Sequence, residues 1–429
     1  MIEPFIILVG LIVVISLVLS LDRPPSAIKH LIALLAYLQL CFGPFLYYKF
    51  FQGTPVSEVW QLEMAVNFEL YFSYILPALI AFIVGLNLTR KNVYNGFVFD
   101  ANSSKSIKTL IWGGIVCQAF LIGSVQNSLW FLLTLGASLA NCGLLALHMK
   151  QIQKAEKMKD ALTLPAGILF CLLFAQSAKS GMFEGLVFWG FTSLTLTLSV
   201  LPRSLTRNFG ILISGALILV TVQTSKGIYR STVWQKGHES SVTQLSKSLV
   251  LGFRIARENS SSETFWFPIV ERLNQGRIVS HVIQKIEQNK IEQDFMRIPR
   301  ALASACVPRL LWPDKPLAGG RENIKRFTDL QLQGNTSMNI SHFGDFFIAF
   351  GKQGGAIFLL FWGFFLGQLI QRITSGNMTK YVLWLSPILL LGLIPIETDF
   401  NMVINHIVKS AVFIVFISKV LTRNQRANS

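Results

Sequence analysis

The sequence has few charged residues and lacks the common catalytic motifs. Asp, Glu, Lys and Arg make up 14% of its 429 residues, whereas a soluble domain usually has about 25%, so the composition argues against a soluble enzyme. The five cysteines are scattered, and an odd, scattered set provides neither a disulfide framework nor a CxxC-type metal site. P-loop, HExxH, GxGxxG, GxSxG and DxD patterns are absent. We therefore expect no metal and no bound cofactor.

Hydrophobic residues dominate instead, at 52% of the chain, and the mean hydropathy is +0.51. A membrane-spanning helix needs about 20 mostly apolar residues. The first apolar run has no basic segment before it and no small-residue cleavage site after it, so we read it as a retained span. Eleven runs predict an all-α polytopic membrane protein with about eleven transmembrane helices: residues 4–21, 31–48, 68–88, 110–125, 129–147, 161–178, 185–201, 209–224, 355–370, 381–396 and 402–421.

The distribution of basic residues predicts how these helices are oriented. If the N-terminus lies outside, the cytoplasmic segments contain seventeen Lys and Arg residues, whereas the short outside segments contain only Lys49 and Lys179. This asymmetry follows the positive-inside rule. We therefore expect an outside N-terminus, a cytoplasmic C-terminus, eight helices in 1–224, a large outer loop in 225–352 and three helices in 353–429.

The large outer loop is basic, with 18 Lys and Arg residues against 11 Asp and Glu residues, within a chain whose net charge is +16. Long loops are exempt from the positive-inside rule, so an anionic ligand would explain this excess better than topology. Periodicity predicts one amphipathic helix from Ser240 or Ser241 to about Glu258 and a second near 279–296. On the first helix, Arg254 and Arg257 share a flank, so this helix would lie on the membrane surface or cap the bundle.

The densest group of basic residues follows these helices. Four prolines between Pro299 and Pro316 predict a stiff, non-helical path. A guanidinium group presents a planar fork that suits two phosphate oxygens, so several such groups on a rigid path suggest a diphosphate site. Alternatively, each arginine could contact lipid headgroups or local carboxylates. The residues that we assign to this site are Arg297, Arg300, Arg309, Lys315 and Arg321.

Candidate catalytic residues come directly before the ninth apolar run. His342 and Asp345 are three residues apart, so one helical turn would bring them together. An imidazole or a carboxylate could take a proton from a hydroxyl group. Alternatively, His342 is an interfacial residue and Asp345 a helix N-terminal charge that the dipole favours. Glu397 and Asp399, in an outside turn, are either catalytic carboxylates or polar residues at a helix end.

Three segments resemble the bacterial O-antigen polymerases, which are Wzy-type oligosaccharide repeat-unit polymerases. They are Val307-Pro-Arg-Leu-Leu-Trp-Pro-Asp-Lys-Pro316, Ser341-His-Phe-Gly-Asp345, and Phe350-Gly351 at the entry to an apolar run. The resemblance is close over 297–355 and elsewhere covers only the layout of spans with one large, late outer loop.

The resemblance implies a metal-independent glycosyltransferase of the polytopic C-type superfold, in the bacterial inner membrane. Its donor and acceptor would be undecaprenyl-diphosphate-linked glycans at the outer face, and the lipid diphosphate would leave. The basic residues named above would hold the diphosphates, Asp345 or His342 would activate the acceptor hydroxyl, and Arg254 and Arg257 would hold the second lipid-linked substrate. Membrane lipids, a flippase and a chain-length regulator are the implied partners, and no nucleic acid is expected.

Three other functions fit parts of the pattern. An O-antigen ligase-type enzyme has the same layout and donor but transfers finished glycan to another acceptor. A polysaccharide or lipid transporter or flippase would have charged residues along its spans and internal repeats, whereas here the charge gathers in the outer loop. A structural partner of a secretion complex would tolerate the loss of any single loop arginine.

Overall fold

The chain is helical throughout its described part. The computed structural model describes residues 2–54, 63–89, 97–100, 103–123, 130–153, 155–180, 183–230, 232, 242–258, 263–307, 311, 312, 314, 315, 320–328, 330, 338–374 and 379–426. These residues contain no β-strand. The helices in chain order are α1 (Ile2–Ser20), α2 (Pro24–Tyr37), the π-helical turn η1 (Leu38–Phe42), α3 (Gly43–Phe50), α5 (Phe68–Asn87), α6 (Ser103–Gly123), α7 (Trp130–Ile152), the 3-10 turn η2 (Met158–Ala161), α8 (Leu164–Ser180), α9 (Glu184–Val200), α10 (Leu205–Arg230), α11 (Val242–Glu258), α12 (Glu263–Leu273), α13 (Gly276–Glu287), α14 (Arg297–Cys306), α15 (Arg321–Phe327), α16 (Ser341–Thr374), α17 (Lys380–Leu390) and α18 (Phe400–Arg426).

Seven helices in this part of the chain are long and apolar enough to cross a membrane. They are α1, the continuous α2–η1–α3 segment, α5, α7, α10, α16 and α18. Each of the eleven apolar runs overlaps a helix, but the runs in α6, α8, α9 and α17 are not among these seven. In the most apolar stretch of α10 only 6% is buried inside the protein. Exposed apolar surface on this scale is typical of contact with lipid.

The loop helices confirm one prediction and correct two others. The amphipathic helix expected to end near Glu258 is α11. The second helix is shorter than 279–296, because α13 ends at Glu287 and Asn289 takes a left-handed conformation with φ of 52°, which stops a helix. The non-helical path expected from Pro299 is wrong over α14, since Pro299 is the third residue of that helix, where a missing N–H removes no intrahelical bond.

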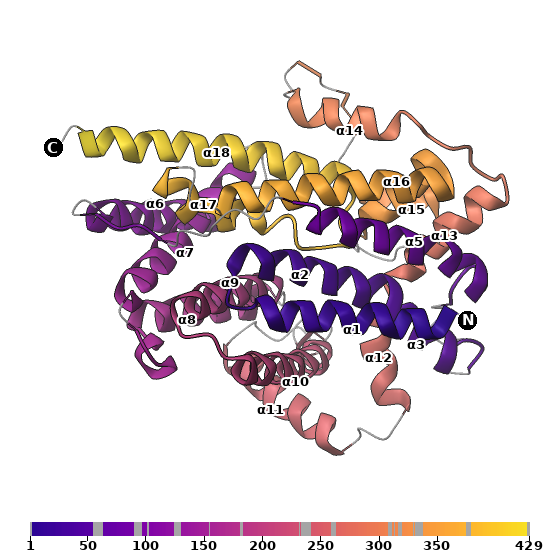
Figure 1. Cartoon of the computed structure of the whole chain (residues 1–429), viewed down its shortest axis with the longest axis horizontal. Helices are drawn as coiled ribbons and strands as arrows, with labels where there is room; N and C mark the ends of the chain where they lie inside the picture. The colour runs from indigo at the N-terminus through magenta and orange to yellow at the C-terminus, as the bar shows by residue number, and fades with distance from the viewer. Residues whose placement is uncertain are drawn as a thin grey trace.

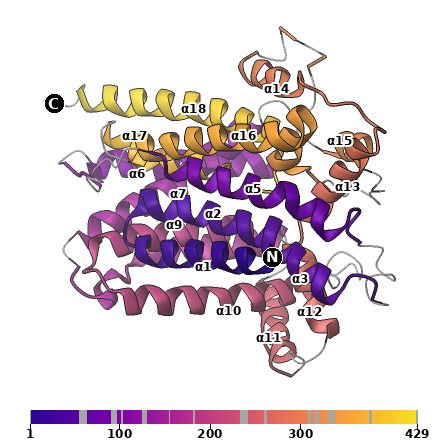
Figure 2. The ribbon, with the colours of Figure 1, turned by 45° about the vertical axis from the view of Figure 1, so that its right-hand side comes forward.

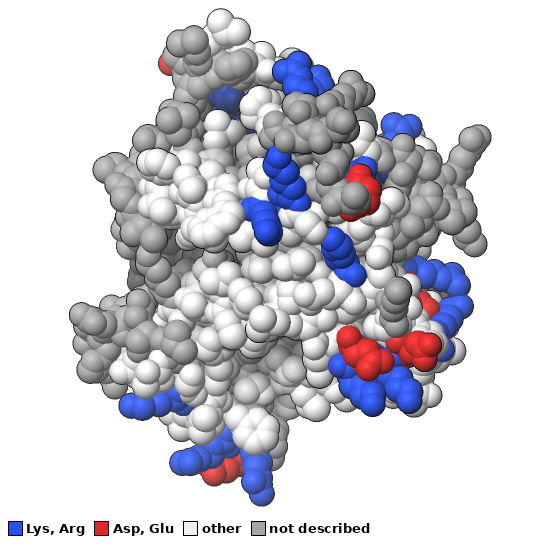
Figure 3. Space-filling view, turned by 90° about the vertical axis from the view of Figure 1, so that its left-hand side faces the viewer, with Lys and Arg blue, Asp and Glu red and all other residues white. Residues whose placement is uncertain are grey.

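Contacts bring together the segments that the charge pattern assigns to one side. Arg203, in the turn after α9, pairs with Asp22, in the turn after α1, at 3.3 Å. Lys380 pairs with Asp100, which again joins two such segments. Helices α12 to α15 gather at the opposite end of the bundle from the C-terminus (Figures 1 and 2). On the face at the C-terminal end, Lys and Arg side chains outnumber Asp and Glu side chains (Figure 3).

Close packing of α5 against α16 fixes the helix that carries the candidate catalytic residues. A Cβ atom at Gly85 would collide with the Leu360 carbonyl oxygen, and one at Gly363 would collide with the Phe82 carbonyl oxygen. Small residues at such contacts let two helix backbones approach closely. Helix α16 is broken at Gly351, whose φ is 66° and ψ is −164°, so its first ten residues form a separate short segment near the predicted loop boundary at 352.

Candidate functional site

A pocket of about 120 Å³ opens where α14, α15 and the first turns of α16 and α18 meet. Helices α14 and α15, which contribute to its lining, lie at the end of the bundle that carries the loop helices (Figures 1 and 2). The segments that form it are far apart in sequence and come together only in the folded chain. The residues that line it are Asp294, Arg297, Ile298, Arg300, Ala301, Asn323, Arg326, Asp345, Phe400 and Asn401.

A buried ion pair forms the floor of this pocket. The Arg297 guanidinium donates a hydrogen bond from Nε to Oδ1 of Asp345 at 2.7 Å, and its Nη2 forms a salt bridge with the same oxygen at 2.5 Å. The backbone N–H of Phe400 donates to the other oxygen, Oδ2, at 2.6 Å. The guanidinium also lies 4.6 Å from the centre of the Phe327 ring. Burial lowers the pKa of Arg297, but the Asp345 and Asp399 carboxylates outweigh burial and raise it, so this side chain stays charged.

The two candidate catalytic residues lie in different surroundings. Both oxygens of Asp345 already accept hydrogen bonds, so the carboxylate could take a proton only after one of these bonds is replaced. His342 does not line the pocket. Its Nδ1 lies 3.4 Å from the Thr398 carbonyl oxygen, and its Nε2 has no hydrogen-bond partner among the described residues. In this part of the chain no hydrogen bond joins His342 to Asp345.

The turn before α18 is bound to the N-terminus of α16. Ser341 Oγ donates to the Ile396 carbonyl at 2.6 Å, and the His342 N–H donates to the Thr398 carbonyl at 3.1 Å. Asp399 accepts from the Ile340 N–H at 2.5 Å and from Asn323 Nδ2 at 3.0 Å. Asp399 is fully buried, so it lies directly behind Asn323 in the pocket wall.

Asp399 is the group in this site that titrates near neutral pH. Burial raises its pKa most strongly, and the neighbouring Asp345 carboxylate raises it further. The positive charge of Arg297 and the hydrogen bonds from Asn323 and Ile340 oppose this change. The result is a pKa of about 7, so near neutral pH the site gains or loses one negative charge beside Arg297.

This pKa predicts how stability depends on pH. The folded protein holds a proton on Asp399 up to about pH 7, whereas the ordinary value is 3.8. Its contribution to stability is therefore full below the ordinary pKa and is lost as the pH rises through about 7. Between about pH 5 and 8, the unfolding temperature of Asp399→Asn in detergent should fall less than that of the wild type. Glu322→Gln, at an exposed carboxylate, is the control, and parallel curves for Asp399→Asn and wild type would contradict the assignment.

Two further arginines lie at the mouth of the pocket. Arg300 is 3.3 Å and Arg326 is 3.9 Å from Oδ2 of Asp294. Their side chains are 51% and 61% exposed, against 14% for Arg297. Among the described residues, three guanidinium groups and two carboxylates therefore line the pocket, and these five groups have one positive charge in excess. Such a pocket favours an anion with several oxygens.

The structure brings together only some of the residues assigned from sequence. Arg297, Arg300 and Asp345 line the pocket. Lys315 instead donates to the Ser304 and Val307 carbonyls at the end of α14, at 2.5 and 3.1 Å. Of the remaining assigned residues, the three that the structure describes do not line it. Arg321 is the exposed first residue of α15. Arg254 and Arg257 are exposed on α11, which lies on the opposite side of the bundle from α14 (Figures 1 and 2). Arg309 lies outside the described residues.

Sequence reasoning missed Arg326, Asp294 and Asn323. No local pattern distinguishes Arg326 from Lys325 beside it, because only the folded position of α15, which packs against α13, turns one of the two toward the pocket. The sequence does contain one signal for the pocket: Asp294 is an acidic residue close to Arg297 and Arg300, and such a residue is a candidate partner for them.

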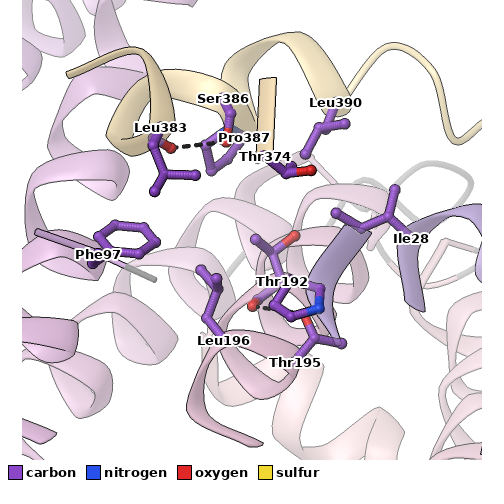
Figure 4. Close-up of a pocket in the computed structure, with 11 residues that line it drawn as sticks. Ile28, Phe97, Thr192, Thr195, Leu196, Thr374, Leu383, Ser386, Pro387 and Leu390 are labelled. Atoms are coloured by element: carbon purple, nitrogen blue, oxygen red, sulfur yellow. Dashed lines mark hydrogen bonds between the residues drawn. The ribbon is translucent and has the colours of Figure 1, made fainter. Parts of the chain in front are cut away.

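A second gap lies deeper in the bundle, between α2, α9 and α17 (Figure 4). It measures about 10 Å³ and is lined mainly by apolar side chains and threonines, such as Ile28, Leu196 and Thr192. The Thr192 hydroxyl has no hydrogen-bond partner among the described residues. A space of this size holds a water molecule at most, so this gap is not a substrate site.

Comparison with protein families places the chain in one of them. The model described as "Domain of unknown function (DUF8712)" matches residues 47–427. The chain belongs to this family, and the matched region includes every residue of the pocket. No curated protein and no solved structure matches the sequence.

Proposed function

We propose that this member of a family of unknown function polymerises undecaprenyl-diphosphate-linked oligosaccharide repeat units. The reaction would take place at the outer face of the bacterial inner membrane and would build O-antigen, capsule or exopolysaccharide. One observation carries the proposal: three arginines and a buried carboxylate converge on one pocket at the loop end of an apolar helical bundle. The resemblance of 297–355 to O-antigen polymerases supports it, because the pocket draws most of its residues from this segment.

The charges in the pocket suit a lipid diphosphate as leaving group. Arg300 and Arg326, whose ion pairs with Asp294 are partly exposed, would bind the diphosphate oxygens. Arg297 would add positive charge below them. When the acceptor hydroxyl attacks the anomeric carbon, the bond from that carbon to the diphosphate oxygen breaks, and negative charge grows on the leaving oxygen. Fixed guanidinium groups stabilise such charge most where water is excluded.

The proton of the acceptor hydroxyl needs a base within hydrogen-bond reach of the pocket. Asp345 is the candidate that meets this condition, because it lies on the pocket floor. An anion that draws Arg297 away from Asp345 would free Oδ1 to accept the proton. His342 remains the second candidate, with Nε2 as its acceptor, and it would need the start of α16 to shift.

The arrangement in the membrane is part of the same proposal. The chain would cross eleven times, with the N-terminus outside and the C-terminus in the cytoplasm. The seven long apolar helices, the basic C-terminal face and the contacts between predicted cytoplasmic turns support it. The arginine pocket would then lie at the outer face, where lipid-linked repeat units are presented.

The decisive experiment is a product assay in the host. The gene is deleted and complemented with the wild type, and lipid-linked and surface glycans are separated on a gel. Single repeat units in the deletion strain and a ladder after complementation are expected. A ladder that persists on the lipid carrier without reaching its final acceptor would instead indicate a ligase. A ladder unchanged by the deletion would contradict both and direct attention to transport.

A further inference from the structure

A second group of basic residues lies at the loop end of the bundle, away from the pocket. Lys226 and Arg230 occupy the last two turns of α10, and Arg272 lies in the last turn of α12. These three cations interact electrostatically with one another, and Lys226 and Arg272 also interact with two carboxylates, Glu184 at the start of α9 and Glu397 before α18. The second cluster, as we call these five residues, thus also has one positive charge in excess.

Helix stability alone does not explain this cluster. Lys226 and Arg230 are four residues apart on one helix, and like charges at this spacing are destabilising. The helix dipole favours a cation in the last turn of each helix, but it does not favour the convergence of cations from α10 and α12. An anion bound between α10 and α12 would lower the repulsion among these cations.

The contacts within the second cluster do not fully neutralise its positive charge. Arg272 pairs with Glu397 at 3.6 Å, and both side chains are partly exposed. Lys226 is half-buried, yet within the described part of the chain it makes no hydrogen bond and no ion pair within contact distance. A partly desolvated ammonium group without a close partner is unfavourable, so an anionic ligand would stabilise it.

The position of the second cluster indicates what kind of anion would bind there. It lies at the end of α10, the candidate span with the least buried surface. Leu217 and Ile218, both just over two turns before Lys226, are 66% and 61% exposed. A lipid chain that lies along this apolar surface would carry its headgroup to the level of Lys226 and Arg230.

We propose that Lys226, Arg230 and Arg272 bind the diphosphate headgroup of a second lipid molecule. The identity of this ligand as a lipid-linked substrate rests on the proposed function, whereas the presence of an anion site does not. The two sites share no residue, so they can be occupied together. They meet at one turn, in which Glu397 contacts Arg272 and Asp399 contacts Asn323 in the pocket wall.

This proposal differs from the sequence-based prediction, which gives the second substrate to Arg254 and Arg257. Both are exposed on α11, where a phosphate contact would be screened by water and salt. Lys226 and Arg272 come from two different elements and face a common partner, Glu397. Convergence from two elements fixes a headgroup better than one flank of a single helix.

Native mass spectrometry of the purified full-length protein tests the proposal, with farnesyl diphosphate as the probe. The wild type should bind two molecules. Lys226→Gln/Arg272→Gln should retain one, and its second site should weaken about tenfold or more, because two charge-assisted contacts are lost. Lys226→Gln alone breaks no close contact and should weaken the same site while leaving the unfolding temperature unchanged. Lys290→Gln, at an exposed lysine after α13, is the matched control and should bind two.

Each other outcome has a definite meaning. Binding of one molecule that Lys226→Gln/Arg272→Gln does not affect would overturn the second site and leave the proposed function standing. A wild type that binds no farnesyl diphosphate would count against both. Phosphatidylglycerol separates the two sources of lipid phosphate: if the double variant loses phosphatidylglycerol but not farnesyl diphosphate, the second cluster holds an ordinary phospholipid, and the proposal is wrong.

Discussion

Arg297→Met should destabilise the protein by about 3–5 kcal/mol, because it leaves the Asp345 carboxylate buried without its partner. Asp345 is only 2% exposed, and Arg297 supplies both a hydrogen bond and the ion pair that it makes, while Phe400 N–H supplies a second hydrogen bond. The variant also loses the contact between the guanidinium group and the Phe327 ring. Thermal unfolding in detergent measures the effect, and a clear fall in the unfolding temperature is expected.

Arg300→Met is the matched control, since it changes the same residue type one turn along the same helix. The Arg300 ion pair is half exposed, and such pairs contribute about 0–1 kcal/mol. A second variant, Arg297→Met/Asp345→Asn, removes the stranded charge and should recover part of the lost stability. If Arg297→Met and Arg300→Met were equally stable, the buried pair would not hold α14 to α16.

The Arg297–Asp345 pair also shows what the sequence could reveal. Both residues were singled out, Arg297 as a phosphate ligand and Asp345 as a base, but their partnership was not predicted. They are 48 residues apart, and local patterns report only neighbours within a few residues. Continuous apolar runs each overlap a helix of the structure, because a helix that crosses a membrane must be apolar along its length.

The structure of the loop was harder to predict, because much of it depends on contacts between residues that are far apart in sequence. Helix α11 follows from its own amphipathic pattern, which needs no tertiary partner. The packing of α15 against α13, which brings Arg326 to the pocket, joins segments that carry no matching pattern. Asp399 shows the same limit, since an acidic residue in a turn reads as solvated, yet it is buried and joins the N-terminus of α16 to the pocket wall.

Arg300→Gln/Arg326→Gln should abolish the glycan ladder while leaving the fold intact. A hydrogen bond to a charged group contributes about 1.5–3 kcal/mol, so losing two contacts to the diphosphate should reduce turnover at least about a hundredfold. Stability should hardly change, because both side chains are largely exposed and their pairs with Asp294 are long. Glycan gels of the complemented deletion strain measure the activity, and unfolding temperatures of the purified variants measure the stability.

Lys325→Gln is the matched control for this variant. It removes a charge from an exposed side chain directly beside Arg326, outside the pocket lining. A general effect of loop charge on lipid binding would reduce the ladder in Lys325→Gln as well, whereas a diphosphate site in the pocket would leave that control at the wild-type level. A normal ladder in Arg300→Gln/Arg326→Gln would exclude the pocket mouth as the diphosphate site. The combination of a stable protein, a missing ladder and an unaffected control is expected only if these two guanidinium groups act on the substrate.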